Sequence, residues 1–364
     1  MKIFVAVSFH GFGHLAQVAP LVNTLFARHP DWQLVLQCAA GRELLQHWIT
    51  PDFIHVQVAT DPGIPMHNAL RVDAAETWRQ YRLDNARNQD DVAGLQKLLA
   101  LHRPDLVLSN IGYRVARAAS QLSIPCFHFC SLNWADSFYP YCAGQAEATA
   151  IYQALCDDYN QAEVFFRLPP YMPMPGLKNR VDVGPVCRVG RKQDLHAHFG
   201  HEPDVRHVLV TMGGMPYPLP FERWPQRSDL FFIHAGAPTT PRADLINLAD
   251  CGISHLDLVA SCAVILTKPG YGTFMEAACS GTPVLYVSRG DWPEQPPLLA
   301  WQRQHGYCRE ITETQFQQGY FVDDIEQAVV AARSAQYAER VSPTGIDEII
   351  ARIELQLGKS GGDT

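Results

Sequence analysis

The sequence lacks the features that mark several large classes of protein. No apolar run approaches the ~18 residues needed to cross a membrane, and no block of more than two consecutive basic residues occurs in the 364-residue chain. Lys and Arg number 29 against 37 Asp and Glu, a formal charge of −8. Because nucleic-acid surfaces need clustered Lys and Arg, no nucleic-acid partner is expected. Stable membrane insertion is not expected either.

Cysteine is present, but without the spacing of a structural metal site. The 10 cysteines form no C-x-x-C pair, and Cys38, Cys126 and Cys279 stand in apolar runs as small buried residues do. The apolar N-terminus is interrupted by His10 and His14 and has no small-x-small cleavage site, unlike a signal peptide. We therefore expect a reduced, cytoplasmic protein; its oligomeric state is left open.

Metal-ligand patterns are also missing. No Asp-x-Asp motif, the commonest ligand pattern for a metal bound to diphosphate, occurs in the chain. His196, His198 and His201 lie in a polar segment without a carboxylate at helical spacing. We interpret them as surface residues and expect no metal.

Alternating strand and helix patterns predict the fold class. Apolar residues make up 47% of the chain, enough for a core in each of two domains of roughly 150 residues. Each half opens with a continuous apolar run followed by a glycine turn, and buried parallel strands give such runs. The sequence predicts two doubly wound, Rossmann-like α/β domains that face each other across a cleft. The predicted strands are 3–8, 33–38, 53–58, 106–109 and 125–130, then 207–212, 230–234, 263–267 and 283–287.

A proline-rich stretch divides the two halves. Residues 172–188 carry prolines that no central strand or helix interior tolerates, so we place the linker there. The predicted domains are an acceptor-side domain over 1–180 and a donor-side domain over 181–340. Helical spacing of apolar residues near the C-terminus predicts a helix over 341–358 that packs back on the first domain.

The first glycine loop allows two interpretations. Gly11-Phe12-Gly13-His14-Leu15-Ala16 matches the dinucleotide pattern G-x-G-x-x-G/A. The second predicted strand ends in Leu36-Gln37-Cys38, without the acid that would hold a ribose, so an NAD-dependent oxidoreductase is only a third choice. Either the loop approaches a ligand closely, with His14 at the start of a helix, or it only makes a tight turn.

A second glycine loop follows a strand in the other half. In Lys268-Pro-Gly-Tyr-Gly-Thr-Phe-Met-Glu276, a predicted helix N-terminus offers an anion site and Lys268 adds a positive charge. Thr273 and Glu276 also match a capping box, which would give Glu276 a purely structural role. Gly213-Gly214 and Asp291-Trp-Pro-Glu-Gln295 follow other strands, so three loops are expected to converge on a ligand with phosphates and hydroxyls.

These motifs resemble the donor-binding signature of GT-B glycosyltransferases, both the plant secondary-product transferases and the family of the peptidoglycan GlcNAc transferase. By this resemblance, Lys268 takes the place of a diphosphate-contacting His and Glu276 binds the ribose diol. Phosphate contacts fall to Gly272 and Thr273, with Gly214 bordering the diphosphate, Ile253 holding the base edge, and Glu294 and Gln295 binding sugar hydroxyls. The resemblance also puts Gly13, Gly270, Tyr271 and Asp291 on the donor side.

A wider resemblance covers nearly the whole chain. The stretches SLNWADSFYPYCAG, CDDYNQAEVFFRLPPYMPMPG and TKPGYGTFMEAACSGTPVLYVSRGDWPEQPPLL are similar to the glycosyltransferase-like N-terminal region of plant L-arabinokinases. The kinase part of those proteins has no counterpart here.

The resemblance also implies catalytic residues. His14 falls where the family keeps its general base, and His10 and Phe12 fall on the acceptor side. The family's orienting Asp is replaced by Asn110, which can orient an imidazole but cannot stabilise imidazolium as a carboxylate does; Asp136 is a substitute. We expect an inverting, metal-independent transferase that uses a nucleotide-diphosphate sugar, UDP-linked by family default, and a small or soluble acceptor. No resident cofactor is expected. The alternative is a non-catalytic nucleotide-sugar sensor or regulatory protein.

Overall fold

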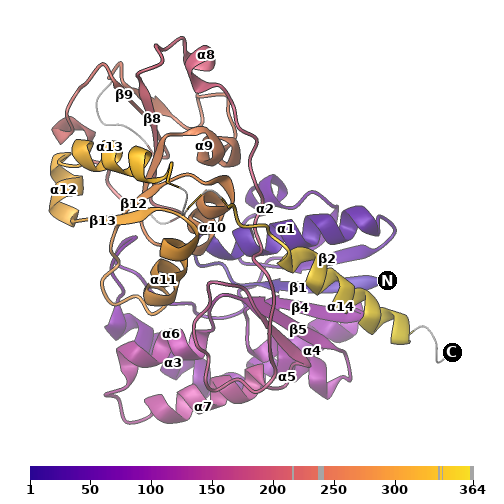
Figure 1. Ribbon diagram of the computed structural model, residues 1–364. Helices are drawn as coiled ribbons and strands as arrows, with labels where there is room; N and C mark the ends of the chain where they lie inside the picture. Colours follow the sequence, from indigo (N-terminus) through magenta and orange to yellow (C-terminus); the bar gives the residue numbers. More distant parts are fainter. Residues whose placement is uncertain (215–216, 237–241, 335–336, 338, 361–364) are drawn as a thin grey trace. The chain divides into compact units, whose positions relative to one another are not determined.

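The computed structural model describes residues 1–214, 217–236, 242–334, 337 and 339–360 (Figure 1). The chain divides into two compact units. Unit 1 consists of Met1–Met66, Val72–Val186 and Pro343–Thr364, and unit 2 of His67–Arg71 and Cys187–Ser342. None of the described helices has the length and apolarity needed to cross a membrane.

Unit 1 is built on a parallel sheet with the strand order β3-β2-β1-β4-β5-β6-β7. Its strands are β1 (Lys2–Val7), β2 (Gln33–Gln37), β3 (Phe53–Val56), β4 (Leu106–Asn110), β5 (Cys126–Cys130), β6 (Val164–Arg167) and β7 (Arg180–Asp182). Its helices are α1 (Gly13–Arg28), α2 (Arg42–Trp48), α3 (Ala74–Ala86), α4 (Asn88–His102), α5 (Arg114–Gln121), α6 (Trp134–Cys142), α7 (Ala148–Tyr159) and α14 (Gly345–Ser360).

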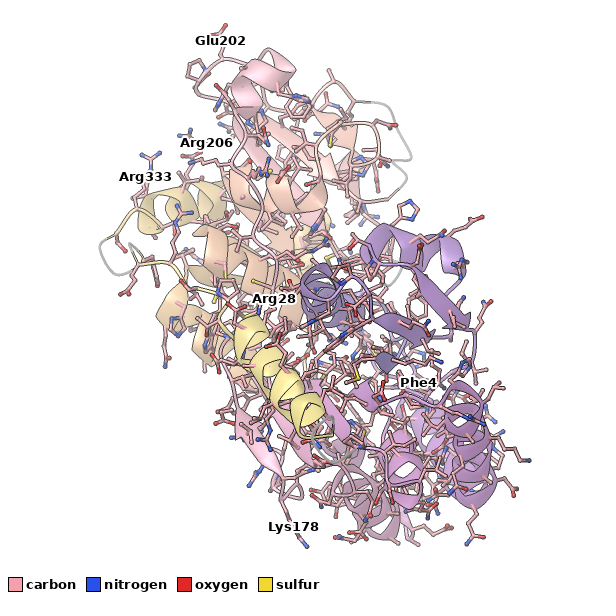
Figure 2. All side chains as sticks on the ribbon, turned by 90° about the vertical axis from the view of Figure 1, so that its right-hand side faces the viewer. Phe4, Arg28, Lys178, Glu202, Arg206 and Arg333 are labelled. Atoms are coloured by element: carbon pink, nitrogen blue, oxygen red, sulfur yellow. The ribbon has the colours of Figure 1, made fainter. Side chains whose placement is uncertain are left out.

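Helices cover both faces of this sheet, which explains why its central strands are apolar throughout. On one face, Phe4, Val35 and Val107 pack against apolar residues of α4 and α5. On the other, α1 contacts β1 and β4 and also packs against α14. Nε2 of His29 lies 2.8 Å from Oε1 of Glu354, and Arg28 pairs with Asp347. Figure 2 shows Arg28 beside α14.

Unit 2 repeats the architecture with a parallel sheet in the order β10-β9-β8-β11-β12-β13. The strands are β8 (Arg206–Thr211), β9 (Leu230–His234), β10 (Leu245–Asn247), β11 (Val264–Thr267), β12 (Val284–Val287) and β13 (Cys308–Ile311). The helices are α8 (Leu195–Phe199), the 3₁₀ turn η1 (Phe221–Arg223), α9 (His255–Ser261), α10 (Tyr271–Ser280), α11 (Gln295–His305), α12 (Glu313–Gln318) and α13 (Val322–Ala331). One apolar cluster covers each face of the sheet.

The prediction of two doubly wound α/β domains is confirmed. In each sheet the strand order reverses beside the first strand, between β1 and β4 in unit 1 and between β8 and β11 in unit 2. Ligands of such sheets bind beyond the carboxyl ends of the strands at this reversal. The loops after β1, β4, β8 and β11 are therefore the places to look for a site.

The division of the chain differs from the predicted one in two respects. Part of the proline-rich segment forms the short edge strand β7, since the stretch Arg180–Asp182 is free of proline and can pair with β6. The chain then enters unit 2 at Cys187. In addition, His67–Arg71 belongs to unit 2, where Ala69 and Leu70 are buried in the apolar cluster of one sheet face.

Candidate functional site

The loop after β11 leads directly into helix α10. Gly270 is the N-cap residue of α10 and the helix starts at Tyr271. Thr273 therefore lies inside the first turn instead of capping it, and Glu276 lies beyond the first turn. The capping-box interpretation of Thr273 and Glu276 is wrong, because it requires Thr273 itself to be the N-cap.

Glu276 is a buried carboxylate with an unusual environment. The residue belongs to α10 and is 7% exposed. Nδ1 of His255 lies 3.9 Å from its Oε2. Burial raises the pKa of Glu276 to about 7, against the lowering effect of Arg188. Burial also lowers the pKa of His255 to about 4, so the imidazole is neutral near pH 7.

The Lys268 ammonium lies next to two glycine loops. A Cβ at Gly213 would come within 3.4 Å of Nζ, and one at Gly270 within 3.3 Å. These loops follow β8 and β11, which pair through Thr211 and Thr267, so both glycines leave room for the lysine. Burial and the nearby Arg289 lower the pKa of Lys268 to about 7. An anion bound here would favour the charged ammonium.

The loop between β12 and α11 carries a braced polar cluster. The Arg289 guanidinium stacks on the Trp292 ring at 3.7 Å, and Trp292 Nε1 donates to Oε2 of the buried Glu294 over 3.3 Å. Gln295 accepts from the Arg289 backbone N–H at 2.7 Å and donates to the Ser288 hydroxyl at 2.8 Å. These two hydrogen bonds of the Gln295 amide stabilise the conformation of the loop. Its predicted contact with sugar hydroxyls would be a second role.

The remaining predicted donor-side residues of unit 2 occupy surface or half-buried positions around these loops. Gly214 and Asp291 are exposed, Gly272, Thr273 and Ile253 are half-buried, and Tyr271 is buried. Arg289 was not predicted, because no spacing rule in the sequence singles out an arginine after a strand.

In unit 1, His14 stands in the first turn of α1 and is 5% exposed. Its Nδ1 lies 2.7 Å from Oδ1 of Asn110. The Asn110 amide nitrogen donates to Oε1 of Gln17 at 2.9 Å and to the Phe129 carbonyl at 2.6 Å. Gln17 in turn donates to the Ser131 hydroxyl at 2.9 Å. Because two acceptors hold the Asn110 nitrogen, its oxygen faces His14; Nδ1 of His14 carries the proton and Nε2 is the accepting nitrogen.

Asp136, the predicted substitute for the orienting acid, lies at the start of a helix. It lies in the first turn of α6, where its backbone N–H donates to Oδ1 of the N-cap residue Asn133 at 2.8 Å. Its carboxylate accepts from Asn133 at 2.6 Å and from Tyr152 at 3.2 Å. Asn110 makes a hydrogen bond to Nδ1 of His14, and the contacts of Asp136 stabilise the start of α6; a catalytic role of Asp136 stays a prediction.

The other predicted residues of unit 1 surround His14. The Trp134 ring packs edge-on against His14 and His10, with centroid separations of 5.4 and 5.7 Å. Phe12 is exposed and packs against Trp48 at 5.9 Å. Gly13 is exposed, and a Cβ there would meet open space.

Asp61 is a polar residue near this cluster that sequence reasoning missed. It follows β3, and its carboxylate accepts hydrogen bonds from the Ser8 hydroxyl and from the Gly63 backbone N–H, the latter at 3.0 Å. Burial raises its pKa. The loop carries no motif, so only the pairing of distant strands reveals this residue.

Across the described residues, no group of three or more His, Cys, Asp or Glu side chains is arranged to hold a metal ion. Nε2 of His196 lies 3.0 Å from the Val205 carbonyl oxygen, and Nε2 of His198 lies 2.8 Å from that of Cys251. His201 contacts His207 at 3.0 Å.

Comparison with known proteins relates the sequence to one plant enzyme. The chain is 25% identical over 341 residues to an L-arabinokinase of Arabidopsis thaliana, a match that covers 89% of this chain and 32% of that protein. The chain thus spans about a third of the length of that relative. No family model matches the sequence.

Several solved structures are similar over almost their whole length. The calicheamicin glycosyltransferase CalG4 is matched with a TM-score of 0.65 at 15% identity, covering 99% of both chains. Phytolacca americana UGT2, complexed with UDP-2-fluoro-glucose and pterostilbene, is matched at 0.63 and 13%, covering 98% of this chain and 99% of that one. A UDP-N-acetylglucosamine 2-epimerase from Listeria monocytogenes is matched at 0.57 and 14%, covering 100% and 97%.

At these identities the likeness concerns the fold, and the matched folds serve more than one reaction. This chain has a parallel sheet in each unit, and the strand order of each sheet reverses beside its first strand. The matches to the solved structures extend over nearly the whole of both chains, so the similarity includes both units. The chain has the GT-B fold of glycosyltransferases.

Proposed function

We propose that this chain is an inverting, metal-independent glycosyltransferase that uses a nucleotide-diphosphate sugar, UDP-linked. The observation that carries the proposal is the pair formed by Lys268 and Glu276 at the strand reversal of unit 2. Here the Lys268 ammonium lies beside two glycine loops, and the buried Glu276 carboxylate belongs to α10, the helix that begins directly after the second of these loops. Diphosphate and ribose diol are the complementary ligand groups.

The residues of unit 2 account for the departure of the diphosphate. When the sugar–oxygen bond breaks, negative charge grows on the leaving phosphate. The Lys268 ammonium and the backbone N–H groups at the start of α10 stabilise that charge without a metal ion. Glu276 accepts hydrogen bonds from the ribose hydroxyls and so holds the nucleotide in place.

The residues of unit 1 account for activation of the acceptor. Nε2 of His14 takes the proton of the acceptor hydroxyl as the oxygen forms its bond to the anomeric carbon. A single displacement of this kind inverts the configuration at that carbon. Asn110, held by Gln17 and Phe129, keeps Nδ1 of His14 protonated and the ring in one orientation.

Titration calorimetry with UDP and with UDP-glucose tests the donor half of the proposal. The parent chain should bind both ligands, and Glu276→Gln should weaken both. Glu222→Gln is the matched control, since Glu222 is an exposed acid of unit 2 on the turn η1. A chain that binds neither ligand would refute the proposal.

A further inference from the structure

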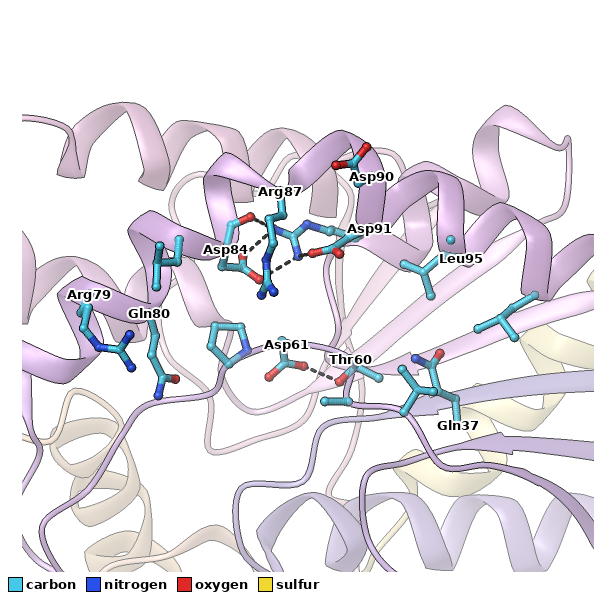
Figure 3. Close-up of a pocket in the computed structure, with 17 residues that line it drawn as sticks. Gln37, Thr60, Asp61, Arg79, Gln80, Asp84, Arg87, Asp90, Asp91 and Leu95 are labelled. Carbon is cyan, nitrogen blue, oxygen red and sulfur yellow. Dashed lines mark hydrogen bonds and ion pairs between the residues drawn. The ribbon is translucent and has the colours of Figure 1, made fainter.

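A pocket in unit 1 is lined by none of the residues assigned so far to the donor or to the base. Its volume is about 600 Å³. It lies between the end of β2, the loop after β3, and helices α3 and α4 (Figure 3). In that view Thr60 and Asp61 lie across the pocket from Asp84, Arg87 and Asp91. Pockets of this size take small molecules.

The charges along the helical wall neutralise one another. Arg114, which is 3% exposed, donates to Asp84 at 2.7 Å and to Asp91 at 2.8 Å. The Tyr113 hydroxyl also donates to Asp84. Three arginines and three aspartates line this wall, so their formal charges balance and the wall as a whole attracts neither anions nor cations: Arg79, Arg87 and Arg114, and Asp84, Asp90 and Asp91. A neutral ligand fits it better than a second phosphate.

Gln37 is the observation that points to a ligand. It ends β2, is 0% exposed and lines the pocket. Neither its amide nitrogen nor its amide oxygen has a hydrogen-bond partner among the described residues. Buried amides are almost always paired. A free donor beside a free acceptor matches a hydroxyl group, which both donates and accepts.

Asp61 connects the pocket to the predicted base. Its carboxylate accepts from the Ser8 hydroxyl, whose oxygen also accepts from Trp134 Nε1 at 3.3 Å. The Trp134 ring packs edge-on against His14. Only Ser8 and Trp134 thus separate the pocket carboxylate from the His14 imidazole. A ligand that contacts Asp61 is therefore connected to His14 through the side chains of Ser8 and Trp134.

We propose that this pocket binds a neutral, polyhydroxylated acceptor of mono- to disaccharide size. Gln37 and Asp61 hydrogen-bond its hydroxyls, while Pro62, Leu83 and Leu95 face the carbon–hydrogen surfaces of the ring. The role as acceptor rests on the proposed function, whereas the ligand class rests on the pocket alone.

Gly94 offers a test that leaves the fold intact. It lines the pocket from α4, and a Cβ there meets nothing within 4 Å. Gly94→Leu therefore places a side chain in the pocket and also improves the helix propensity of α4. Ala93→Leu is the matched control, because Ala93 is the exposed neighbour on the same helix and does not line the pocket. Asp61→Asn removes the carboxylate at similar size.

The experiment measures binding of D-glucose, D-galactose, L-arabinose and sucrose to the full chain by saturation-transfer NMR, with UDP calorimetry on the same samples. We expect saturable binding of at least one saccharide, abolished in Gly94→Leu, weakened about tenfold or more in Asp61→Asn, and unchanged in Ala93→Leu. UDP affinity should be the same in all four proteins.

Two results would overturn the pocket proposal. One is UDP binding without saturable binding of any of the four saccharides; the other is a Gly94→Leu protein that binds the saccharide as the parent does. A third result would separate the two proposals. If the parent protein does not bind UDP but binds a saccharide, and Gly94→Leu abolishes this binding, the proposed function is refuted and the proposed ligand class of the pocket is retained.

Discussion

Replacement of Glu276 by Gln should change stability and ligand affinity in opposite directions. The residue is 7% exposed, and burial raises its pKa from 4.5 to about 7. At pH 8 the folded protein therefore holds an ionised carboxylate at a cost of about 3 kcal/mol. Gln has the same shape without the charge, although its amide remains unpaired at a cost of about 1–3 kcal/mol. The net expectation is a gain of about 1 kcal/mol.

Affinity for the nucleotide should fall in the same variant. Loss of charge-assisted hydrogen bonds to a ribose diol costs about 1–3 kcal/mol, which is roughly a 5- to 150-fold weaker Kd. Thermal melting measures the first effect, expected as a rise of the melting temperature by about 1–2 °C for a chain of 364 residues, and titration with UDP measures the second. The two measurements together separate a ligand-binding carboxylate from a structural one, because replacement of a structural residue would lower the free energy of unfolding.

The refuting result is the reverse pattern. A Glu276→Gln protein with a lower melting temperature and an unchanged affinity for UDP would show that the carboxylate serves the fold. Glu222→Gln controls for loss of one negative charge in unit 2 and should leave both measurements unchanged.

Three further predictions concern the base and the lysine. His14→Ala should lower kcat by about 10²–10⁴-fold with donor Kd unchanged; turnover at the parent rate, once an acceptor is known, would place the base elsewhere. Asn110→Asp puts a carboxylate 2.7 Å from Nδ1 of His14 and should raise the pKa of His14, so that the acidic limb of the pH–rate profile moves to higher pH; an unmoved limb would contradict the assigned hydrogen bond. The pKa of Lys268 is lowered to about 7, and an anionic ligand favours its charged form, so affinity for UDP-glucose should be greatest below pH 7 and decline as the pH rises above it. The test uses Glu276→Gln as background, because this substitution removes a second group that titrates in the same pH range. Calorimetry of Glu276→Gln should show the decline of UDP-glucose affinity with pH, and the double variant Glu276→Gln, Lys268→Met should not show it.

Local patterns in the sequence predicted much of the fold. Continuous apolar runs such as 3–8 and 207–212 became central parallel strands, because helices cover both faces of each sheet. The glycine loops were located correctly for the same reason, since each directly follows such a strand. Boundaries were less predictable, because whether Arg180–Asp182 pairs with β6 depends on partners far away in the sequence.

The candidate site was predictable only where a motif marks it. Lys268 and Glu276 belong to one loop and helix, and their spacing is visible in the sequence. Asp61 and Gln17 act through residues about 50 to 115 positions away, as the bonds to Ser8 and Ser131 show. For Asp136 the sequence pattern is ambiguous, because an acid three residues after an asparagine fits a helix cap as well as a catalytic role.

The path of the chain has a consequence for its synthesis. Ala69 and Leu70 belong to the core of unit 2, yet they leave the ribosome long before Cys187 opens the main part of that unit. Conversely, unit 1 includes Pro343–Thr364, where Ile349, Ile350 and Ile353 of α14 are fully buried. Domains usually fold one after another as they emerge. Here the core of unit 1 stays incomplete until α14 has been synthesised, after the whole of unit 2, so unit 1 cannot finish folding before unit 2 has been made.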